Sequence, residues 1–191
     1  MLTTLFVLAA GSAFRFDADF VEGCSCKDAC SFEITGKIPG CQGAGFYVFR
    51  AGSFGGRSLA GGKVAFAAGP SGWVRLYYDG PTVAVRETAR DFIVAALADW
   101  GKPERVAWAP ITVAGLGGNY IAQVADGKIL QLTTEASVPP FVHRGIFNRK
   151  LHPEIMQGRT LSCAFRDGKR KLGFAGTNGF FNPGVRVSGK L

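Results

Sequence analysis

The sequence has few of the side chains and motifs on which common enzyme sites depend. Among 191 residues there are only 14 acidic side chains and two histidines. The G-x-S-x-G motif of hydrolases, the H-E-x-x-H motif of metalloproteases, the phosphate-binding P-loop and the redox C-x-x-C pair are all missing. These absences argue against the best-known hydrolytic, nucleotide-dependent and redox sites, and they favour a protein that is not an enzyme.

Basic charge is present but is not concentrated anywhere. The formal net charge is +8, and the densest basic run is the tripeptide Lys169-Arg170-Lys171. No basic stripe with interleaved aromatic residues occurs, so nucleic acid is not an expected partner. The apolar run at residues 2–10 is too short to cross a bilayer as a helix, so we expect no membrane span.

Residues 1–13 have two interpretations. The apolar run followed by the small residues Gly11, Ser12 and Ala13 is typical of the end of a secretory signal peptide, although no basic residue precedes it. Alternatively, the run is an apolar strand that the mature chain retains. We favour the signal, which predicts export to the periplasm or the cell exterior, where thiols oxidise.

Glycine and phenylalanine are abundant, with 27 and 16 copies, and this composition favours strands and turns over helices. The one predicted long helix is amphipathic and covers about 83–100, with Thr82 as its N-cap and Gly101 after its end. We predict a single α+β domain over 14–191, a mostly antiparallel sheet, sandwich-like or rolled, with the helix on one face. The predicted strands and hairpins cover 14–22, 43–52, 63–69, 72–80, 119–136 and 159–176.

Between the last two hairpins, residues 137–158 are predicted to form a long loop. This segment contains His143, His152 and Met156. In the hairpin that follows, alternation places Leu161, Cys163 and Phe165 on one face of a strand, so Cys163 is predicted to be a buried core thiol.

The most informative stretch holds four of the five cysteines within 18 positions: Cys24, Cys26, Cys30 and Cys41. In an oxidising compartment they would form two disulfides, and three pairings are open. Cys24 and Cys26 would point the same way along a strand, about 7 Å apart, which is unfavourable for a bridge between them.

The same four thiols suit a soft metal ion equally well. Cys26-x3-Cys30 has the spacing of zinc ligands, and clustered thiolates also bind copper. Because three or four thiols in one short segment cannot easily surround an ion, we expect the segment 137–158 to fold over them. His143, His152 and Met156 are then further candidate ligands. No organic cofactor is expected.

The stretch "FVEGCSCKDACSFEITGKIPGCQGAGFYVF" resembles a bacterial family of unknown function, domain-of-unknown-function family 1326. In that family an opening strand runs into a C-x-C-x3-C-x-C loop. Cys24, Cys26 and Cys30 match its first three cysteines, Phe32 replaces the fourth, and Cys41 matches a later one. The resemblance covers most of the chain. It implies that the cysteine loop is a defining feature, and it implies no mechanism.

Two functional hypotheses follow. The first is an exported, non-catalytic protein that binds copper or zinc through the cysteine loop. The second is an extracellular structural protein, stapled by disulfides, that forms homo-oligomers or filaments by strand addition.

Overall fold

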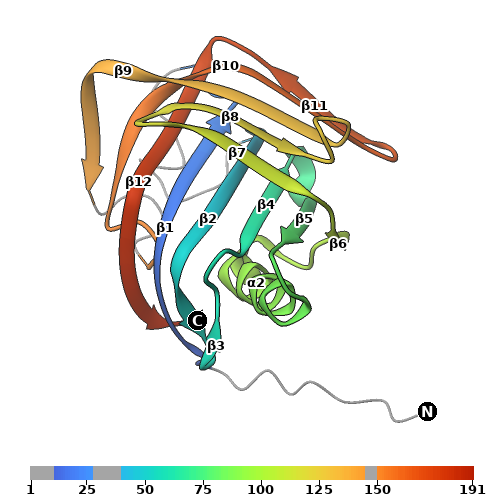
Figure 1. The fold of residues 1–191 in the computed structure, drawn as a ribbon. Helices are drawn as coiled ribbons and strands as arrows, with labels where there is room; N and C mark the ends of the chain where they lie inside the picture. The colour runs from blue at the N-terminus through green and yellow to red at the C-terminus, as the bar shows by residue number, and fades with distance from the viewer. Residues whose placement is uncertain (1–10, 28–39, 145–149) are drawn as a thin grey trace.

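The computed structural model describes residues 11–27, 40–144 and 150–191. Its described part is one twelve-stranded sheet with a single α-helix (Figure 1). The sheet order is β6-β5-β4-β2-β1-β12-β10-β9-β8-β7, with β3 beside β2 and β11 beside β10. Only β5 and β6 pair in parallel. The predicted α+β class with a mostly antiparallel sheet is confirmed, and the sheet is curled into a roll.

The strand bounds are β1 Ala13–Cys24, β2 Gly43–Phe54, β3 Arg57–Ser58, β4 Lys63–Ala68, β5 Val74–Asp79, β6 Arg105–Trp108, β7 Ile111–Leu116, β8 Asn119–Val124, β9 Leu130–Arg144, β10 Glu154–Asp167, β11 Arg170–Phe174 and β12 Thr177–Lys190. Short 3-10 turns lie at Pro70–Gly72 and Ala98–Trp100.

Strand β1 shows why the sheet has a core on each face. Its alternate residues Phe14, Phe16 and Phe20 are buried in one apolar cluster, whereas Val21 is buried in another. Successive side chains of a strand point to opposite faces, so these two clusters lie on opposite sides of the sheet. We call them the helix-side core and the inner core.

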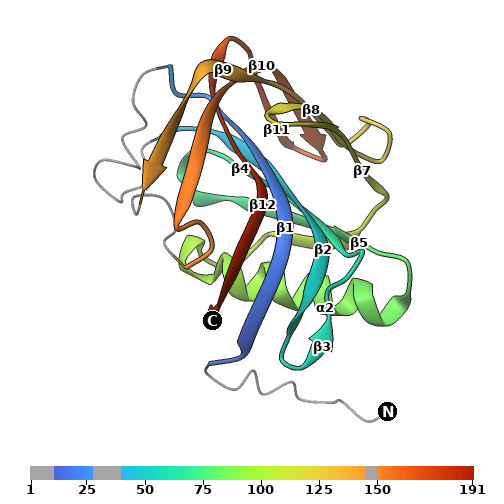
Figure 2. The same ribbon diagram turned by 60° about the vertical axis from the view of Figure 1, so that its left-hand side comes forward.

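The helix, α2, spans Val83–Ala96 and lies across the sheet (Figure 2). Thr82 caps its start, since its hydroxyl accepts a hydrogen bond from the Val85 amide at 3.2 Å. Phe92 packs edge-on against Phe16 and Phe49, with ring centroids 5.4 and 5.1 Å away. The predicted helix was slightly too long, because Leu97 leaves the α conformation and the chain continues as a 3-10 turn.

The segment 137–158 is not the long loop that we predicted from the sequence. Strand β9 extends into this segment from its start, and β10 begins before its end. The two strands pair here, from Glu154 opposite Arg144 to Gln157 opposite Phe141. The register then jumps to Gly158 with Ala136, so residues 137–140 form a bulge. Two prolines, which cannot donate ladder hydrogen bonds, lie in this bulge.

Cys163 is a buried thiol in β10, as predicted. It belongs to the inner core together with Phe165. Leu161 does not share this face and is 42% exposed. The pairing of β10 with β9 shifts register between Thr160 and Ser162, and this irregularity turns Leu161 outward.

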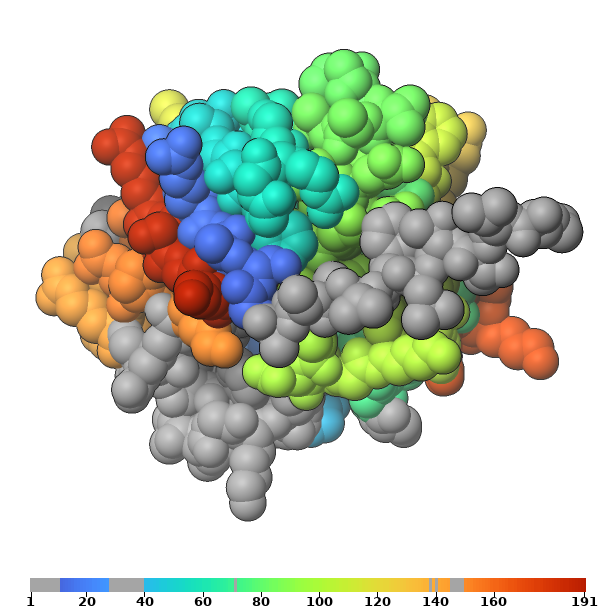
Figure 3. All heavy atoms as spheres, turned by 90° about the horizontal axis from the view of Figure 1, so that it is seen from below, coloured from blue at the N-terminus to red at the C-terminus, as the bar shows by residue number. Residues whose placement is uncertain are grey.

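Seen from below, the ends of β12, β1 and β2 lie side by side next to α2 (Figure 3). Within the described ranges, none of the helices is long and apolar enough to cross a bilayer.

Candidate functional site

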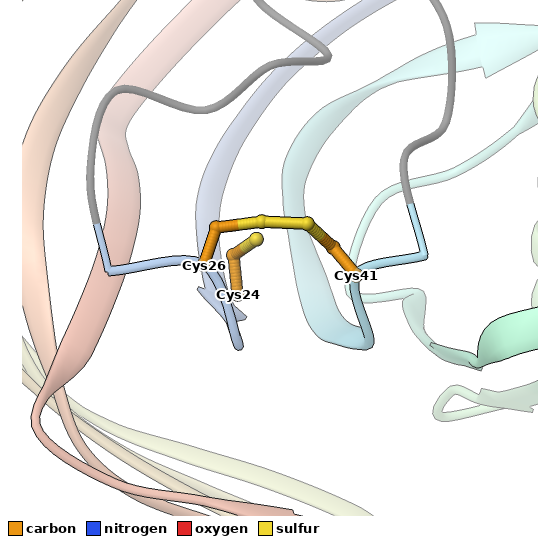
Figure 4. A group of neighbouring side chains, drawn as sticks. All are labelled: Cys24, Cys26 and Cys41. Carbon is orange, nitrogen blue, oxygen red and sulfur yellow. A yellow bond between two sulfur atoms is a disulfide. The ribbon is translucent and has the colours of Figure 1, made fainter.

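Three of the four clustered cysteines meet at one end of the β1–β2 hairpin. The sulfur atoms of Cys24, Cys26 and Cys41 all lie within 4.8 Å of one another. Cys26 and Cys41 form a disulfide whose Cα atoms are 5.9 Å apart. Figure 4 shows the Cys24 side chain directed toward the sulfur–sulfur bond. We call these three residues the cysteine triad.

The β1–β2 pairing positions the triad. Cys24 is the last residue of β1 and lies opposite Gly43, the first residue of β2. One step further along each strand, the Ser25 amide donates to Gln42 O at 2.8 Å, and the Gln42 amide donates to Ser25 Oγ at 2.8 Å. These two bonds hold the chain ends that carry Cys26 and Cys41 together.

A third bond fixes the triad to the neighbouring strand. The backbone amide of Asn178 in β12 donates to the carbonyl oxygen of Cys26 at 2.9 Å. The triad is therefore anchored to three adjacent strands of the sheet, namely β2, β1 and β12.

Gly23 lets two other strands approach this end of β1. A Cβ at position 23 would lie 2.6 Å from Leu132 Cδ1 and 2.9 Å from Thr160 Oγ1. A larger residue at this position would therefore push the Leu132 and Thr160 side chains away from β1. By contrast, a Cβ at Gly40 would meet nothing within 4 Å.

The three cysteines differ in exposure. Cys24 is buried at 5% exposure and belongs to the helix-side core, whereas Cys26 and Cys41 are half-buried at its edge. The sequence left three disulfide pairings open, and the structure contains the Cys26–Cys41 pairing. Cys30, the fourth predicted member, lies outside the described residues.

Three thiolates around one ion, at the Zn–S distance of about 2.3 Å, would place their sulfurs roughly 3.8 to 4.0 Å apart. The Cys24 sulfur lies within 4.8 Å of both other sulfurs, whereas the Cys26 and Cys41 sulfurs are bonded to each other and would have to move apart to reach that separation. The residues therefore fit a soft ion once the disulfide is reduced.

His152 is not in the cysteine group of the described residues. Its Nε2 lies 2.6 Å from the Tyr47 hydroxyl, and its ring packs 4.2 Å from Phe20. Both partners of this hydrogen bond are buried. Burial lowers the pKa of His152 to about 3, and burial, together with the negative charge of Glu22, raises the pKa of Tyr47 well above its usual value. His152 is a neutral core histidine that fixes the segment before β10 to the sheet.

Among the described residues, His143 is linked to the triad through two intermediate residues. Its Nε2 lies 3.0 Å from Gln157 Oε1, and the Gln157 amide donates to Asn178 Oδ1 at 3.2 Å. The Asn178 backbone then binds Cys26. Two residues, Gln157 and Asn178, thus link His143 to Cys26 by hydrogen bonds, and His143 itself is not part of the cysteine group.

Met156 packs against the inner core and pairs with Phe181 of β12. Cys24 belongs to the helix-side core, so the sheet separates these two side chains. The structure therefore brings together Cys24, Cys26 and Cys41 and leaves His143, His152 and Met156 outside this group.

The residues that hold the triad in place were not predicted from the sequence. Ser25 and Gln42 flank cysteines and could have been proposed from their polar side chains. Asn178 could not, because it is separated from Cys26 by most of the chain and acts through its backbone.

Neither the protein-family models nor the curated proteins contain a match to this chain. Among solved structures, it is similar to an enduracididine biosynthesis enzyme, MppR, complexed with the condensation product of pyruvate and imidazole 4-carboxaldehyde. The two share 11% identity over 94% of this chain and 86% of that one, with a TM-score of 0.38. A similarity this remote indicates neither a shared activity nor a shared site.

Proposed function

We propose that the protein is an exported, non-catalytic protein that binds copper or zinc through Cys24, Cys26 and Cys41. The observation that carries this proposal is the convergence of the three sulfurs within 4.8 Å. Thiolates are soft ligands that suit Cu(I) and Zn²⁺. The resemblance to family 1326 is consistent with this proposal, because the cysteine loop is what the two have in common.

Metal binding requires the thiolate form of the ligands, so the metal-bound form is the reduced protein. A fourth ligand would complete a tetrahedral zinc site, whereas three sulfurs are already enough for Cu(I). Cys30 stays the candidate for that position on sequence grounds, since His143, His152 and Met156 lie outside the cysteine group.

The test is metal content of the reduced, full-length chain by native mass spectrometry and elemental analysis. We expect one ion per chain in the wild type and loss of the ion in Cys24→Ser, Cys26→Ser and Cys41→Ser. The matched control is Cys163→Ser, which removes a cysteine of the inner core and should leave the metal content unchanged. Equal metal content in all four variants, or none in the wild type, would contradict the proposal.

A second candidate function is favoured by the disulfide. Cys26–Cys41 staples the end of the β1–β2 hairpin, as expected for an extracellular structural protein. Within the described sheet, β6 and β7 are the end strands, and either could accept a strand from another copy. Filaments or concentration-dependent oligomers, seen by electron microscopy and sedimentation in the oxidised protein, would support this function.

A further inference from the structure

We propose that the Cys26–Cys41 disulfide is a reversible gate on the metal site, so that reduction loads the site and oxidation empties it. This inference rests on the proposed metal-binding function and adds its regulation. It follows because the candidate metal site and the disulfide share atoms. Two of the three triad sulfurs are the two sulfurs of the disulfide.

Because these sulfurs are shared, the disulfide-bonded state and the metal-bound state exclude each other. A sulfur in a disulfide has no thiolate charge to give to an ion, so the oxidised triad retains at most one thiolate donor. Reduction breaks the Cys26–Cys41 bond with two electrons and two protons from a thiol reductant such as glutathione, which leaves as its own disulfide. Binding of the ion then displaces protons from the sulfurs that ligate it.

The strand ends keep the two sulfurs close when the bond between them is open. The paired bonds between Ser25 and Gln42 do not depend on the disulfide, and neither does the bond from Asn178 to the Cys26 carbonyl. The register of Cys24 with Gly43 is part of the β1–β2 ladder. The reduced triad is therefore preorganised, and loading needs no refolding of this end of the hairpin.

Exposure makes the gate accessible to a thiol reagent. Cys26 and Cys41 are half-buried, whereas Cys163 is 3% exposed. A thiolate must contact a disulfide sulfur in order to attack it, so exchange is expected at the Cys26–Cys41 pair.

Because the two equilibria share the same sulfurs, they are thermodynamically linked. An ion that binds only the reduced chain multiplies the ratio of reduced to oxidised chain by the factor 1 + [metal]/Kd. At a free metal concentration 100 times Kd the ratio of reduced to oxidised chain rises about 100-fold. For this two-electron couple, that factor is a shift of about 59 mV in midpoint potential.

The experiment measures the Cys26–Cys41 equilibrium of the full chain in glutathione redox buffers, with free Zn²⁺ set by a chelator. Alkylation and mass spectrometry count the two thiols. We expect the ratio of reduced to oxidised chain to rise about 100-fold when free Zn²⁺ is 100 times Kd. We also expect release of one Zn²⁺ for each disulfide formed when oxidised glutathione is added to the loaded chain.

Two outcomes are distinguishable. If the reduced chain takes up no Zn²⁺ in direct titration, the proposed function itself fails for this ion, and the gate fails with it. Alternatively, the reduced chain binds Zn²⁺ but the midpoint potential of the Cys26–Cys41 couple is the same with and without the ion, or the oxidised chain binds Zn²⁺ equally tightly. Metal binding then stands and the gate is wrong.

A pair of variants tests the preorganisation. Ser25→Ala removes the hydroxyl that accepts from the Gln42 amide but removes no sulfur. We expect it to weaken Zn²⁺ binding by the reduced chain about 3- to 10-fold. Ser188→Ala, an exposed serine of β12, is the control and should bind as the wild type does. Equal affinities for the two variants would show that these bonds do not hold the reduced site together.

Discussion

Cys163 illustrates how burial sets the chemistry of a single side chain. It is enclosed by the inner core, and burial raises the pKa of its thiol to about 12, so it carries almost no thiolate at neutral pH. Cys26 and Cys41, at the edge of the helix-side core, are accessible instead. The five cysteines of the sequence therefore include at least one that only fills the core, and its alternation with Phe165 predicted this, although Leu161 does not share their face.

Replacing Cys163 with serine should destabilise the protein by about 1–3 kcal/mol, because a hydroxyl would replace an apolar thiol at a buried position. Urea unfolding monitored by circular dichroism measures the change. In the folded wild type, Cys163 should also react with a thiol reagent far more slowly than in urea. A stability unchanged within error, together with rapid labelling of the folded chain, would contradict its placement in the core.

His152 should make the protein sensitive to acid. The pKa of the folded state is about 3 and that of an unfolded chain is about 6.5, so the unfolded chain binds an extra proton between those values. Stability is therefore fully present above pH 6.5 and is lost as the pH falls toward 3, at up to about 1.4 kcal/mol per pH unit from this residue.

The comparison variant is His152→Gln, which can still accept a hydrogen bond from Tyr47 but does not titrate. Its free energy of unfolding, measured from pH 7 to pH 4.5, should decline less steeply than that of the wild type. Parallel slopes for the two proteins would mean that His152 is not held neutral by burial.

Helix α2 and the two tight hairpins are the elements that local sequence predicts best. Helical spacing of apolar residues and the cap at Thr82 located α2, and the Asp126-Gly127 and Asp167-Gly168 turns located the hairpins. Asp126 has a positive φ of 54°, a conformation that aspartate and glycine tolerate better than most residues. These signals act between neighbours in the chain, so the sequence alone reveals them.

The path of 137–158 could not be predicted in the same way. Its prolines and histidines suggested a loop, but pairing between β9 and β10 determines its structure, and the bulge at 137–140 accommodates the prolines. The same limit applies to the site. Clustering of cysteines predicted that they meet, whereas the Cys26–Cys41 pairing and the positions of His143, His152 and Met156 outside the triad depend on contacts between distant strands.

The N-cap of α2 provides a test of this element alone. Thr82→Ala should cost about 1 kcal/mol, because the Val85 amide loses its side-chain acceptor. Thr82→Ser keeps an oxygen at that position and should restore most of the stability. Denaturant unfolding of both variants measures the difference, and equal losses would show that the hydroxyl does not cap the helix.

Across the whole molecule, Asp167 joins strands that lie far apart in the order of the curled sheet. This last residue of β10 accepts hydrogen bonds from Tyr77 of β5 at 2.7 Å and from Arg75 of β5 at 2.9 Å, and it lies 3.2 Å from Arg105 of β6. In the sheet order, β4, β2, β1 and β12 lie between β5 and β10. At this position an ion-pair cluster, as well as the inner core, therefore holds the two sides of the curled sheet together.

Asp167→Asn should lower the free energy of unfolding at pH 7 by about 1–3 kcal/mol, because two arginines lose a charged partner. Burial by itself would raise the pKa of Asp167, but hydrogen bonds from Tyr77 and Arg75 and the charges of Arg105 and Arg75 outweigh it, so the pKa is lowered. Its contribution is thus complete above about pH 4 and is lost as the pH falls further. The gap between wild type and variant should narrow in that range, and a gap independent of pH down to 2.5 would contradict this role.

The proposed metal site requires all three triad sulfurs to ligate one ion. X-ray absorption at the zinc edge of the reduced, zinc-loaded chain tests it most directly, since the technique counts sulfur neighbours and gives their distance. We predict at least three sulfur atoms at about 2.3 Å. A shell made only of nitrogen and oxygen atoms at about 2.0 to 2.1 Å would place the ion elsewhere and contradict the claim.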